Sequence, residues 1–514
     1  MMKDIKDIYA AIPHIEDISQ HGVYENKRTK ATETFAIRSS NKNKVVSDLE
    51  EAIRKSGLKD GMTISFHHHF RNGDNVVNMV VEKLAEMGFK NLTMAASSLS
   101  GVHAPLIEHI RNGVITHIET SGLRGELAEQ VSRGLMDFPV VFRSHGGRGA
   151  AIESKDIHID VAFLGAPSCD PFGNANGYSR SEEQTISCGS LGYARPDARN
   201  AGHVIIITNH IDAFPNAPYA IPSNYVDSVV LVDNIGDPKG IMSGATRYTT
   251  NPKELVIAKA AADVIRASGY LYDGFSMQMG SGGASLATAR FIRQMMLDEG
   301  FRCRFALGGI TGQIVAMHEE GLIDRILDVQ SFDLVAAESL LKNRFHQQID
   351  SCYYASYLRT AAVNQLDFVV LSALEIDTDF NINVLTGSDG VIRGAVGGHP
   401  DTAAGASLAV VVAPLTRGRI PSIVNKVNTI VTPGSTVDVV VTEQGIAVHP
   451  DRPDVEENLR DAGIKLSTIE ELKEKAESIV GKPDPIRYKE KIVGVVLYRN
   501  NTVIDVIRQI DEDD

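Results

Sequence analysis

The 514-residue sequence predicts an α/β protein made of two tandem, related halves, each with a mostly parallel sheet flanked by helices. Its length exceeds what one hydrophobic core usually organises. Apolar strands alternate with amphipathic helices, and one strand–turn–helix pattern occurs twice in the same order. We expect a polar extension over residues 1–45 that packs on the first half, a first domain over 46–240 and a second over 241–514.

The repeat is visible in two segments that begin with Asp-Gly and continue as a strand, a Gly-containing turn and a helix. They read DGMTISFHHHFRNGDNVVNMVVEKLAEMGFKNLTMAA from Asp60 and DGFSMQMGSGGASLATARFIRQMMLDEGFRCRFALGG from Asp273. Further on, two aspartates and two asparagines recur at identical spacing: Asp160, Asp170, Asn174 and Asn176, and Asp367, Asp377, Asn381 and Asn383. Alternating elements alone do not preserve such spacing, so we interpret the halves as a duplication.

Local signals mark the boundaries of the second half. Gly236–Pro252 is rich in Gly, Pro and Thr and predicts the join between the halves. Thr468 and Glu471 have the spacing of a capping box, so a helix is expected from there to Gly481. The following stretch, KIVGVVLYRNNTVIDVI, predicts a hairpin turned at Asn500-Asn501, which we assign to the second domain.

Composition narrows the classes of partner. The net charge of −14 disfavours nucleic acid and anionic membranes, because both need positive charge on the protein. The four cysteines (Cys169, Cys188, Cys303 and Cys352) are far apart, which is typical of free thiols in a reducing compartment. The N-terminus lacks the apolar core of a signal peptide, and the apolar runs are too short to cross a bilayer. We therefore expect a cytoplasmic protein.

Glycine-rich segments mark candidate binding turns. In Met277–Ser285 a strand runs into Gly280, Gly282 and Gly283 and then into a helix, an arrangement that presents free N–H groups to a phosphate, pyrophosphate or oxyanion. Two further segments read GAVGGHPDTAAGA from Gly394 and VVTEQGIA from Val440. The first turn also leaves a dinucleotide-binding oxidoreductase open, although the acidic residue expected about 20 residues later is missing.

The order of these motifs resembles the coenzyme A transferase and acetyl-CoA hydrolase superfamily over most of residues 50–450. The resemblance implies that both α/β halves are domains of coenzyme A transferase type. The shared features are the Gly-rich turn after Gln278, a Leu-Glu-Ile-Asp strand end with Asn383, a Gly-Gly-x-x-Asp segment, an Arg-Ile-Pro strand and VTEQGIA. Within the superfamily, HHHFRNGD, FGNANGYS at 172–179 and GGHPDTAAGA at 397–406 are most similar to the citrate lyase α-subunit branch.

This resemblance implies an acyl transferase, a citrate CoA-transferase, within a multi-subunit complex. Subunits of that branch exchange acetyl for citryl on the thioester of a small acyl carrier protein, the γ subunit, and release acetate. A β subunit then cleaves the citryl thioester. The carrier arm is a dephospho-coenzyme-A derivative, so no cofactor is expected to be tightly bound to this chain. We expect an oligomeric complex, and citramalate remains open as the acid in place of citrate.

One departure from the wider superfamily bears on mechanism. Where other members place a nucleophilic glutamate, this chain reads ALGGITGQ from Ala306 to Gln313. The resemblance then implies a ternary complex, in which a citrate carboxylate attacks the acetyl thioester and forms a mixed anhydride without a covalent enzyme intermediate. Two alternatives stay open: a CoA transferase or acetyl-CoA hydrolase that uses Glu375 or Glu443 as nucleophile, and a non-catalytic scaffold.

Candidate site residues come from these segments. The catalytic candidates are Glu443, Gly397 and Gly398. The candidates for contact with the thioester arm are Gly280, Gly282, Gly283, His399, Asp401 and Asn383. The candidates for binding carboxylates are Arg71, Arg143, His145 and Arg148. Each also has a structural interpretation as a turn glycine, a cap or a surface charge. No metal is expected, because a third ligand beside His67 and His69 cannot be located.

Overall fold

The computed structural model describes residues 5–14, 42–179, 187–242 and 249–511. The chain divides into two units, Met1–Ser39 and Ser40–Asp514. The first unit contains a short helix, α1 (Ile5–Ala10). The expected packing of residues 1–45 on the first half involves a segment, 15–41, that lies outside the described residues. Within the described ranges, no helix is long and apolar enough to cross a membrane.

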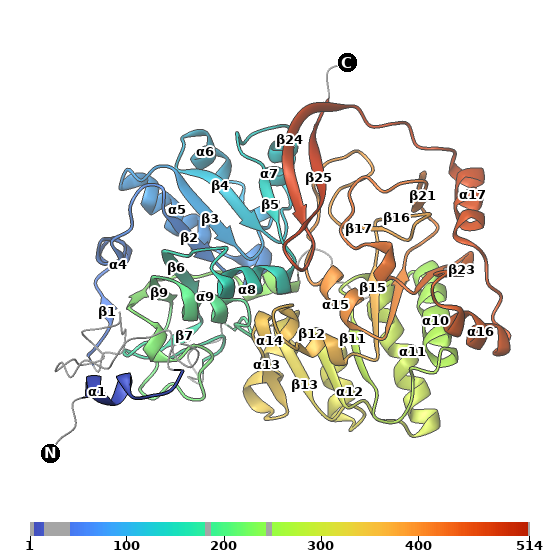
Figure 1. Ribbon diagram of the computed structural model, residues 1–514, viewed down its shortest axis with the longest axis horizontal. Helices are drawn as coiled ribbons and strands as arrows, with labels where there is room; N and C mark the ends of the chain where they lie inside the picture. The colour runs from blue at the N-terminus through green and yellow to red at the C-terminus, as the bar shows by residue number, and fades with distance from the viewer. Residues whose placement is uncertain (1–4, 15–41, 180–186, 243–248, 512–514) are drawn as a thin grey trace. The chain divides into compact units, whose positions relative to one another are not determined.

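Two large sheets organise the second unit (Figure 1). The ten-stranded sheet has the order β1 (Val45–Val46), β10 (Ser228–Leu231), β9 (His203–Thr208), β6 (Val161–Gly165), β2 (Thr63–Phe66), β3 (Leu92–Ala96), β4 (Ile115–Thr120), β5 (Val140–Phe142), β24 (Tyr488–Leu497) and β25 (Val503–Ile510). The eight-stranded sheet has the order β14 (His346–Gln348), β13 (Ile326–Ser331), β12 (Phe305–Ile310), β11 (Ser276–Met279), β15 (Phe368–Ser372), β18 (Leu408–Val412), β22 (Val439–Thr442) and β23 (Gly445–Val448). Neighbouring strands are parallel except β24–β25 and β22–β23, which confirms the predicted fold class.

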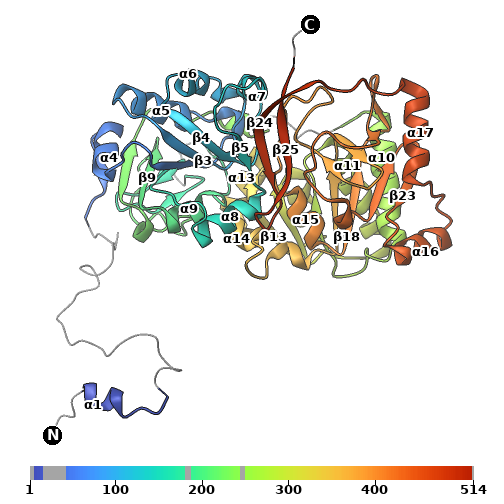
Figure 2. The same cartoon turned by 45° about the horizontal axis from the view of Figure 1, so that its top comes forward.

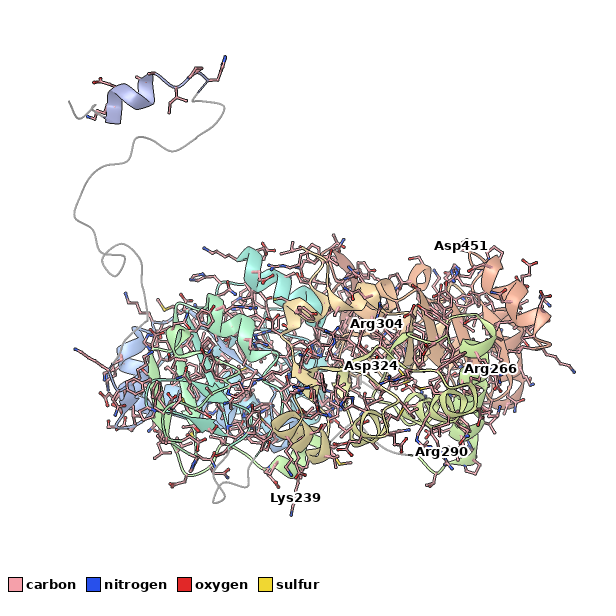
Figure 3. The ribbon with its side chains drawn as sticks, turned by 90° about the horizontal axis from the view of Figure 1, so that it is seen from below. Lys239, Arg266, Arg290, Arg304, Asp324 and Asp451 are labelled. Carbon is pink, nitrogen blue, oxygen red and sulfur yellow. The ribbon has the colours of Figure 1, made fainter. Side chains whose placement is uncertain are left out.

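Helices flank both sheets. In the first half they are α4 (Leu49–Ser56), α5 (Val76–Glu86), α6 (Leu106–Arg111), α7 (Glu126–Ser132), α8 (His145–Ser154) and α9 (Ala194–Asn200). In the second they are α10 (Pro252–Ala267), α11 (Gly283–Glu299), α12 (Gly312–Glu319), α13 (Leu334–Lys342), α14 (Ser351–Ala355), α15 (His399–Gly405), α16 (Pro453–Asp461) and α17 (Ile469–Val480). Every residue of β18, LAVVV, is buried, as parallel strands covered on both faces require. Arg266 on α10 and Arg290 on α11 are exposed (Figure 3).

The two sheets share one strand order, which confirms the internal repeat. The first half has β10-β9-β6-β2-β3-β4-β5 and the second has β22-β18-β15-β11-β12-β13-β14. The first aspartate of each repeat, Asp160 or Asp367, makes an equivalent hydrogen bond in its own sheet. Asp160 accepts a hydrogen bond from the backbone N–H of Thr63 at 2.8 Å, and Asp367 accepts one from Ser276 at 2.7 Å. Each carboxylate therefore ties two neighbouring parallel strands together at their start.

The second repeated aspartates form equivalent turns. Asp170 accepts hydrogen bonds from the backbone and side-chain nitrogens of Asn174, between β7 (Ser168–Cys169) and β8 (Ala175–Asn176). Asp377 does the same with Asn381, between β16 (Glu375–Asp377) and β17 (Ile382–Asn383). The repeated Asp–Asn spacing is therefore explained by turn geometry.

The C-terminal hairpin forms as predicted but belongs to the other half. Its turn contains Asn501 with a φ of 64°, and the capping box of Thr468 and Glu471 starts α17. The assignment of the hairpin to the second domain is wrong, because β24 pairs in parallel with β5 in the first sheet (Figures 1 and 2). Strand β24 supplies the hydrogen-bonding partners that the edge of β5 needs. Arg143 also donates to Asn501 in the turn, at 2.7 Å.

A loop of the second half is bonded to the first half. The backbone N–H of Val396 donates to the carbonyl of Ser121 at 2.7 Å, and Leu123 donates to Gly394 at 3.1 Å. Apolar residues from the same loop, including Leu385 and Ile392, join the core of the first half. This loop therefore fixes how the two halves meet.

Candidate functional site

A cavity of about 540 Å³ lies between the two halves of the second unit. From the first half, it is lined by His68, Arg71, Ser98, Ser100, Ser121, Arg124, His145 and Tyr193. From the second half, its main segments are residues 278–284, 371–374 and 393–399. Most of these residues follow the carboxyl ends of strands in the two sheets, where parallel α/β folds bind ligands.

The turn from β11 to α11 forms one wall. The N-cap of α11, Gly282, has no side chain to accept hydrogen bonds from the first turn. The N–H groups of Gly283 and Ala284, which line the cavity, have no partner within the helix. The helix dipole adds partial positive charge there. Gly282 is also a packing glycine, since a Cβ would lie 2.2 Å from Oγ of Ser372. This wall favours an anion or a developing oxyanion.

Gly397 and Gly398 lie on another wall, for different reasons. Gly397 has a φ of +57°, and its carbonyl accepts a hydrogen bond from the backbone of His145 at 2.8 Å. Space for a Cβ is open there, so the backbone conformation is what requires glycine. Gly398 is a close-approach glycine, because a Cβ would lie 2.5 Å from the hydroxyl of Tyr354.

Four arginines line the cavity, and two of them, Arg71 and Arg124, come from the first half. Nη1 of Arg71 donates to the carbonyl of Ile241 at 3.0 Å. Burial, followed by the nearby charge of Arg124, lowers the pKa of Arg71 to about 10. Burial also lowers the pKa of Arg124, which has no hydrogen-bond or ion-pair partner among the described residues. Of the described residues that line the cavity, Glu254 alone carries a carboxylate. This imbalance suits a substrate with several negative charges.

Two histidines of the cavity are neutral at physiological pH. Burial lowers the pKa of His145 to about 3, and the charges of Arg148, Arg124 and Arg71 contribute. The His145 ring lies 4.4 Å from the ring of Tyr193. Burial also lowers the pKa of His399 to about 4. Both ring nitrogens of His399 already have partners, Oγ1 of Thr432 at 2.7 Å and the carbonyl of Ser372 at 3.2 Å. Of these two histidines, His145 is therefore the one whose neutral ring can donate a hydrogen bond to a substrate without adding charge.

Two of the basic candidates lie outside the cavity wall. Arg143 donates to Glu119 at 2.8 Å and to the hairpin turn. Both terminal nitrogens of Arg148 are bonded to the carboxylate of Asp197, at 2.8 and 2.7 Å. Neither arginine is among the cavity-lining residues, so the lining gives no support to the prediction that they bind the substrate.

Asp401 and Glu443 are also turned away from the cavity. Asp401 accepts hydrogen bonds from Oγ of Ser144 and the backbone N–H of Gly146, and burial raises its pKa to about 6. Glu443 accepts one from the backbone of Leu415 at 2.8 Å and pairs with Lys253 at 3.4 Å. Asp401 ties α8 to α15 and Glu443 anchors a loop, so the cavity wall does not include them.

Asn383 likewise lies outside the wall. Its amide donates to Glu375 at 2.8 Å, and its oxygen accepts hydrogen bonds from the backbone of Leu385 and Thr386. Glu375 is buried, which raises its pKa, and it too is absent from the lining. The two glutamates considered as alternative nucleophiles, Glu375 and Glu443, are thus both outside the cavity.

The segment 306–313, where a superfamily nucleophile is expected, contains one cavity-lining glycine that has no room for a side chain. Gly309, in β12, lines the cavity, and a Cβ on it would lie 2.1 Å from ring atoms of Phe332. The missing glutamate is therefore accompanied by a packed aromatic ring.

Sequence reasoning missed several lining residues. Arg124 follows β4, and its place after a parallel strand is the signal that points to it. Gln278 also lines the cavity, and its amide donates to the hydroxyl of Tyr354 at 3.0 Å. Its Oε1 atom is buried with no hydrogen-bond partner among the described residues.

Comparison with known proteins gives concordant matches. The model of the family described as "Citrate lyase, alpha subunit (CitF)" matches residues 42–510. The citrate lyase alpha chain of Haemophilus influenzae is 54% identical over 508 residues, covering 99% of this chain and 97% of that protein. The Escherichia coli citrate lyase alpha chain is 56% identical over 481 residues, covering 93% and 94%.

Solved structures agree. A Streptococcus mutans protein assigned as the alpha subunit of citrate lyase, solved in complex with citrate, superposes with a TM-score of 0.89 at 56% identity and 92% coverage of both chains. The alpha subunit of malonate decarboxylase from Acinetobacter baumannii has a TM-score of 0.63 at 15% identity, covering 85% of this chain and 88% of that one. The second match shows the fold alone.

Proposed function

This chain belongs to the citrate lyase alpha-subunit family, and from that premise we propose that it exchanges acetyl for citryl on the thioester of an acyl carrier subunit. An acetyl thioester and citrate are converted to a citryl thioester and acetate. One observation carries the proposal: the same cavity is lined by Arg71 and Arg124 from the first half and by the N-terminus of α11 from the second. The arginines suit a substrate with several carboxylates. The helix N-terminus suits a thioester carbonyl whose oxygen becomes an oxyanion during the reaction.

The side of the cavity that the first half of the protein forms suits citrate as the acid. The charge of Arg124 lowers the pKa of Arg71, and a bound carboxylate offsets that repulsion. The related Streptococcus mutans protein was solved with citrate, which favours citrate over citramalate as the acid here. Neutral His145, from the same side of the cavity, can donate a hydrogen bond to citrate.

The exchange takes two steps. A citrate carboxylate attacks the acetyl carbonyl, the thiolate of the carrier leaves, and a citryl–acetyl anhydride forms. The thiolate then attacks the citryl carbonyl, and acetate leaves with the bridging oxygen. Each attack passes through an oxyanion, for which the N–H groups of Gly283 and Ala284 are the proposed donors.

The protein contributes binding geometry and electrostatics to these steps. Holding citrate and thioester in attack geometry supplies up to roughly 7–11 kcal/mol of the barrier lowering. A well-placed oxyanion donor adds about 2.7–4 kcal/mol. The thiolate and carboxylate that exchange are both substrate groups, so no protein nucleophile is needed.

A glutamyl route is the second candidate mechanism, and one observation defines it. Glu254 lines the cavity and is half-buried, whereas Gly309 is covered by Phe332. If an enzyme carboxylate attacks the thioester, Glu254 is the side chain among the described lining residues that can do so.

The partners follow from the same proposal. The thioester arm, a dephospho-coenzyme-A derivative, is carried by the acyl carrier subunit, and a β subunit takes the citryl product. All four cysteines are free and buried, which suits a reducing compartment, and we propose the cytoplasm.

A transferase assay on the full chain tests the function. Acetyl-CoA or the acetylated carrier is offered with citrate, acetate or succinate, and acyl thioesters are identified by mass spectrometry. The proposal expects a citryl thioester with citrate and no hydroxylamine-trapped acyl adduct on the protein. A trapped adduct that disappears in Glu254→Gln establishes the glutamyl route instead, and failure to form any citryl thioester contradicts the function.

A further inference from the structure

A cross-half contact holds the guanidinium of Arg71. Arg71 follows β2 in the first half, and Phe332 follows β13 in the second. The Cζ atom of Arg71 lies 4.9 Å from the centroid of the Phe332 ring, within the range of a cation–π contact. Both residues line the cavity. The ring therefore presents its face to the cation that is proposed to bind citrate.

The Phe332 ring is itself fixed in place. Its backbone N–H donates to the carbonyl of Ile310 at 2.7 Å, and the next residue, Asp333, caps α13. Ring atoms occupy the space that a side chain at Gly309 needs, at 2.1 Å from an ideal Cβ. The absence of a side chain at Gly309 is thus what admits the ring to this wall.

The backbone of Arg71 is held in an unusual conformation. Its φ is 54°, in the left-handed region that non-glycine residues rarely adopt, and it starts the short 3-10 helix Arg71–Gly73. Nη1 is bonded to the carbonyl of Ile241 and the guanidinium lies over the ring of Phe332, so contacts to residues 241 and 332 both restrict its orientation. Such orientation is what two-pronged carboxylate recognition requires.

We propose that Phe332 is a positioning residue that orients Arg71 for citrate, seated by the absence of a side chain at Gly309. The inference rests on the proposed function, since it assumes that Arg71 binds the acid. It assigns Phe332 no contact with the reacting atoms. Loss of its aromatic face weakens citrate binding and leaves the affinity for the acetyl thioester unchanged.

The test uses the full chain with Phe332→Leu and a matched control, Phe345→Leu. Phe345 lies under Arg344 at 4.6 Å but is exposed and outside the cavity lining. Phe332→Leu is expected to raise the citrate Kd, measured by calorimetry, roughly 2- to 30-fold. The control is expected to match the wild type. The KM for the acetyl thioester is expected to be equal in all three proteins.

A fluorination series separates positioning from packing. Mono-, di- and trifluorophenylalanine at position 332 keep the ring but progressively weaken its attraction for a cation. The proposal expects the citrate Kd to rise step by step while Tm stays constant. The inference is overturned if the wild type binds citrate and the citrate Kd is the same in the fluorinated proteins and in Phe332→Leu. That result leaves the proposed function standing. No citrate binding by the wild type overturns both.

Discussion

The guanidinium of Arg148 and the carboxylate of Asp197 form a two-pronged ion pair, with N–O distances of 2.8 and 2.7 Å, between α8 and α9. Both side chains are buried. Nη2 of Arg148 also donates to the carbonyl of Ala95 in β3 at 2.8 Å. The pair therefore supports the first half beside the cavity, and the positive charge of Arg148 contributes to the lowered pKa of His145.

Replacing Arg148 is expected to reduce stability rather than citrate affinity. Arg148→Met leaves Asp197 buried without its partner, and breaking a buried pair costs about 3–5 kcal/mol. We expect a clear fall in Tm by calorimetry, with the citrate KM of the folded enzyme within about twofold of wild type. Arg148→Met with Asp197→Leu is the control and is expected to recover part of the loss. A large rise in citrate KM at unchanged Tm contradicts this assignment.

Replacing Arg124 is expected to reduce citrate affinity rather than stability. Arg124 has no hydrogen-bond or ion-pair partner among the described residues, so Arg124→Gln removes no internal bond and relieves the repulsion of Arg71. Loss of one charge-assisted hydrogen bond, about 1.5–3 kcal/mol, corresponds to a roughly 10- to 100-fold rise in citrate Kd. Arg290→Gln, on the exposed face of α11, is the matched control. An unchanged Kd in Arg124→Gln removes this residue from the citrate site.

The α11 turn is expected to tolerate no side chain at its N-cap. In Gly282→Ala the new Cβ would lie 2.2 Å from Oγ and 2.8 Å from Cβ of Ser372. Overpacking of this kind costs about 1–3 kcal/mol, and it shifts the N–H groups proposed to bind the oxyanion. We expect kcat to fall at least about tenfold. Adding Ser372→Gly should restore much of kcat, and the single Ser372→Gly variant is the control. Wild-type kcat in Gly282→Ala argues against the proposed oxyanion site.

His399 is expected to make stability depend on pH on the acid side. Its pKa is lowered from 6.5 to about 4 by burial, so the unfolded chain takes up a proton that the folded chain resists. The contribution of His399 is therefore complete above pH 6.5 and is lost as pH falls toward 4. At about 1.4 kcal/mol per pKa unit, the loss approaches about 3 kcal/mol. His399→Gln should flatten the curve of Tm against pH in this range, whereas exposed His158→Gln should not. An equally steep curve in both variants refutes the prediction.

The sequence predicted the elements that depend on local or repeated patterns. The Asp-Gly repeat, the helix cap at Thr468 and the turn at Asn501 are all present, because each is determined by neighbouring residues. Gly282 and Gly397 both line the cavity. Close packing against Ser372 requires glycine at position 282, and a positive φ favours it at position 397.

Pairings between strands far apart in the chain could not be predicted, because local sequence patterns do not encode them. Nothing near Val140 indicates that a strand beginning at Tyr488 will pair with it, so the hairpin was assigned to the wrong half. An arginine beside glycines looks the same in sequence whether it meets a substrate, as proposed for Arg71, or a buried aspartate, as Arg148 does. Only the assembled fold shows which charges are already satisfied.

Direct attack of citrate on the acetyl thioester can be detected by an isotope experiment. Citrate with heavy oxygen in all carboxylates is mixed with an excess of enzyme over acetyl thioester, so that each active site turns over once. Direct attack predicts that acetate released in this single turnover carries one heavy oxygen, the former bridge of the citryl–acetyl anhydride. Unlabelled acetate, with heavy oxygen recovered in a protein glutamate such as Glu254, would contradict it and establish a covalent enzyme intermediate.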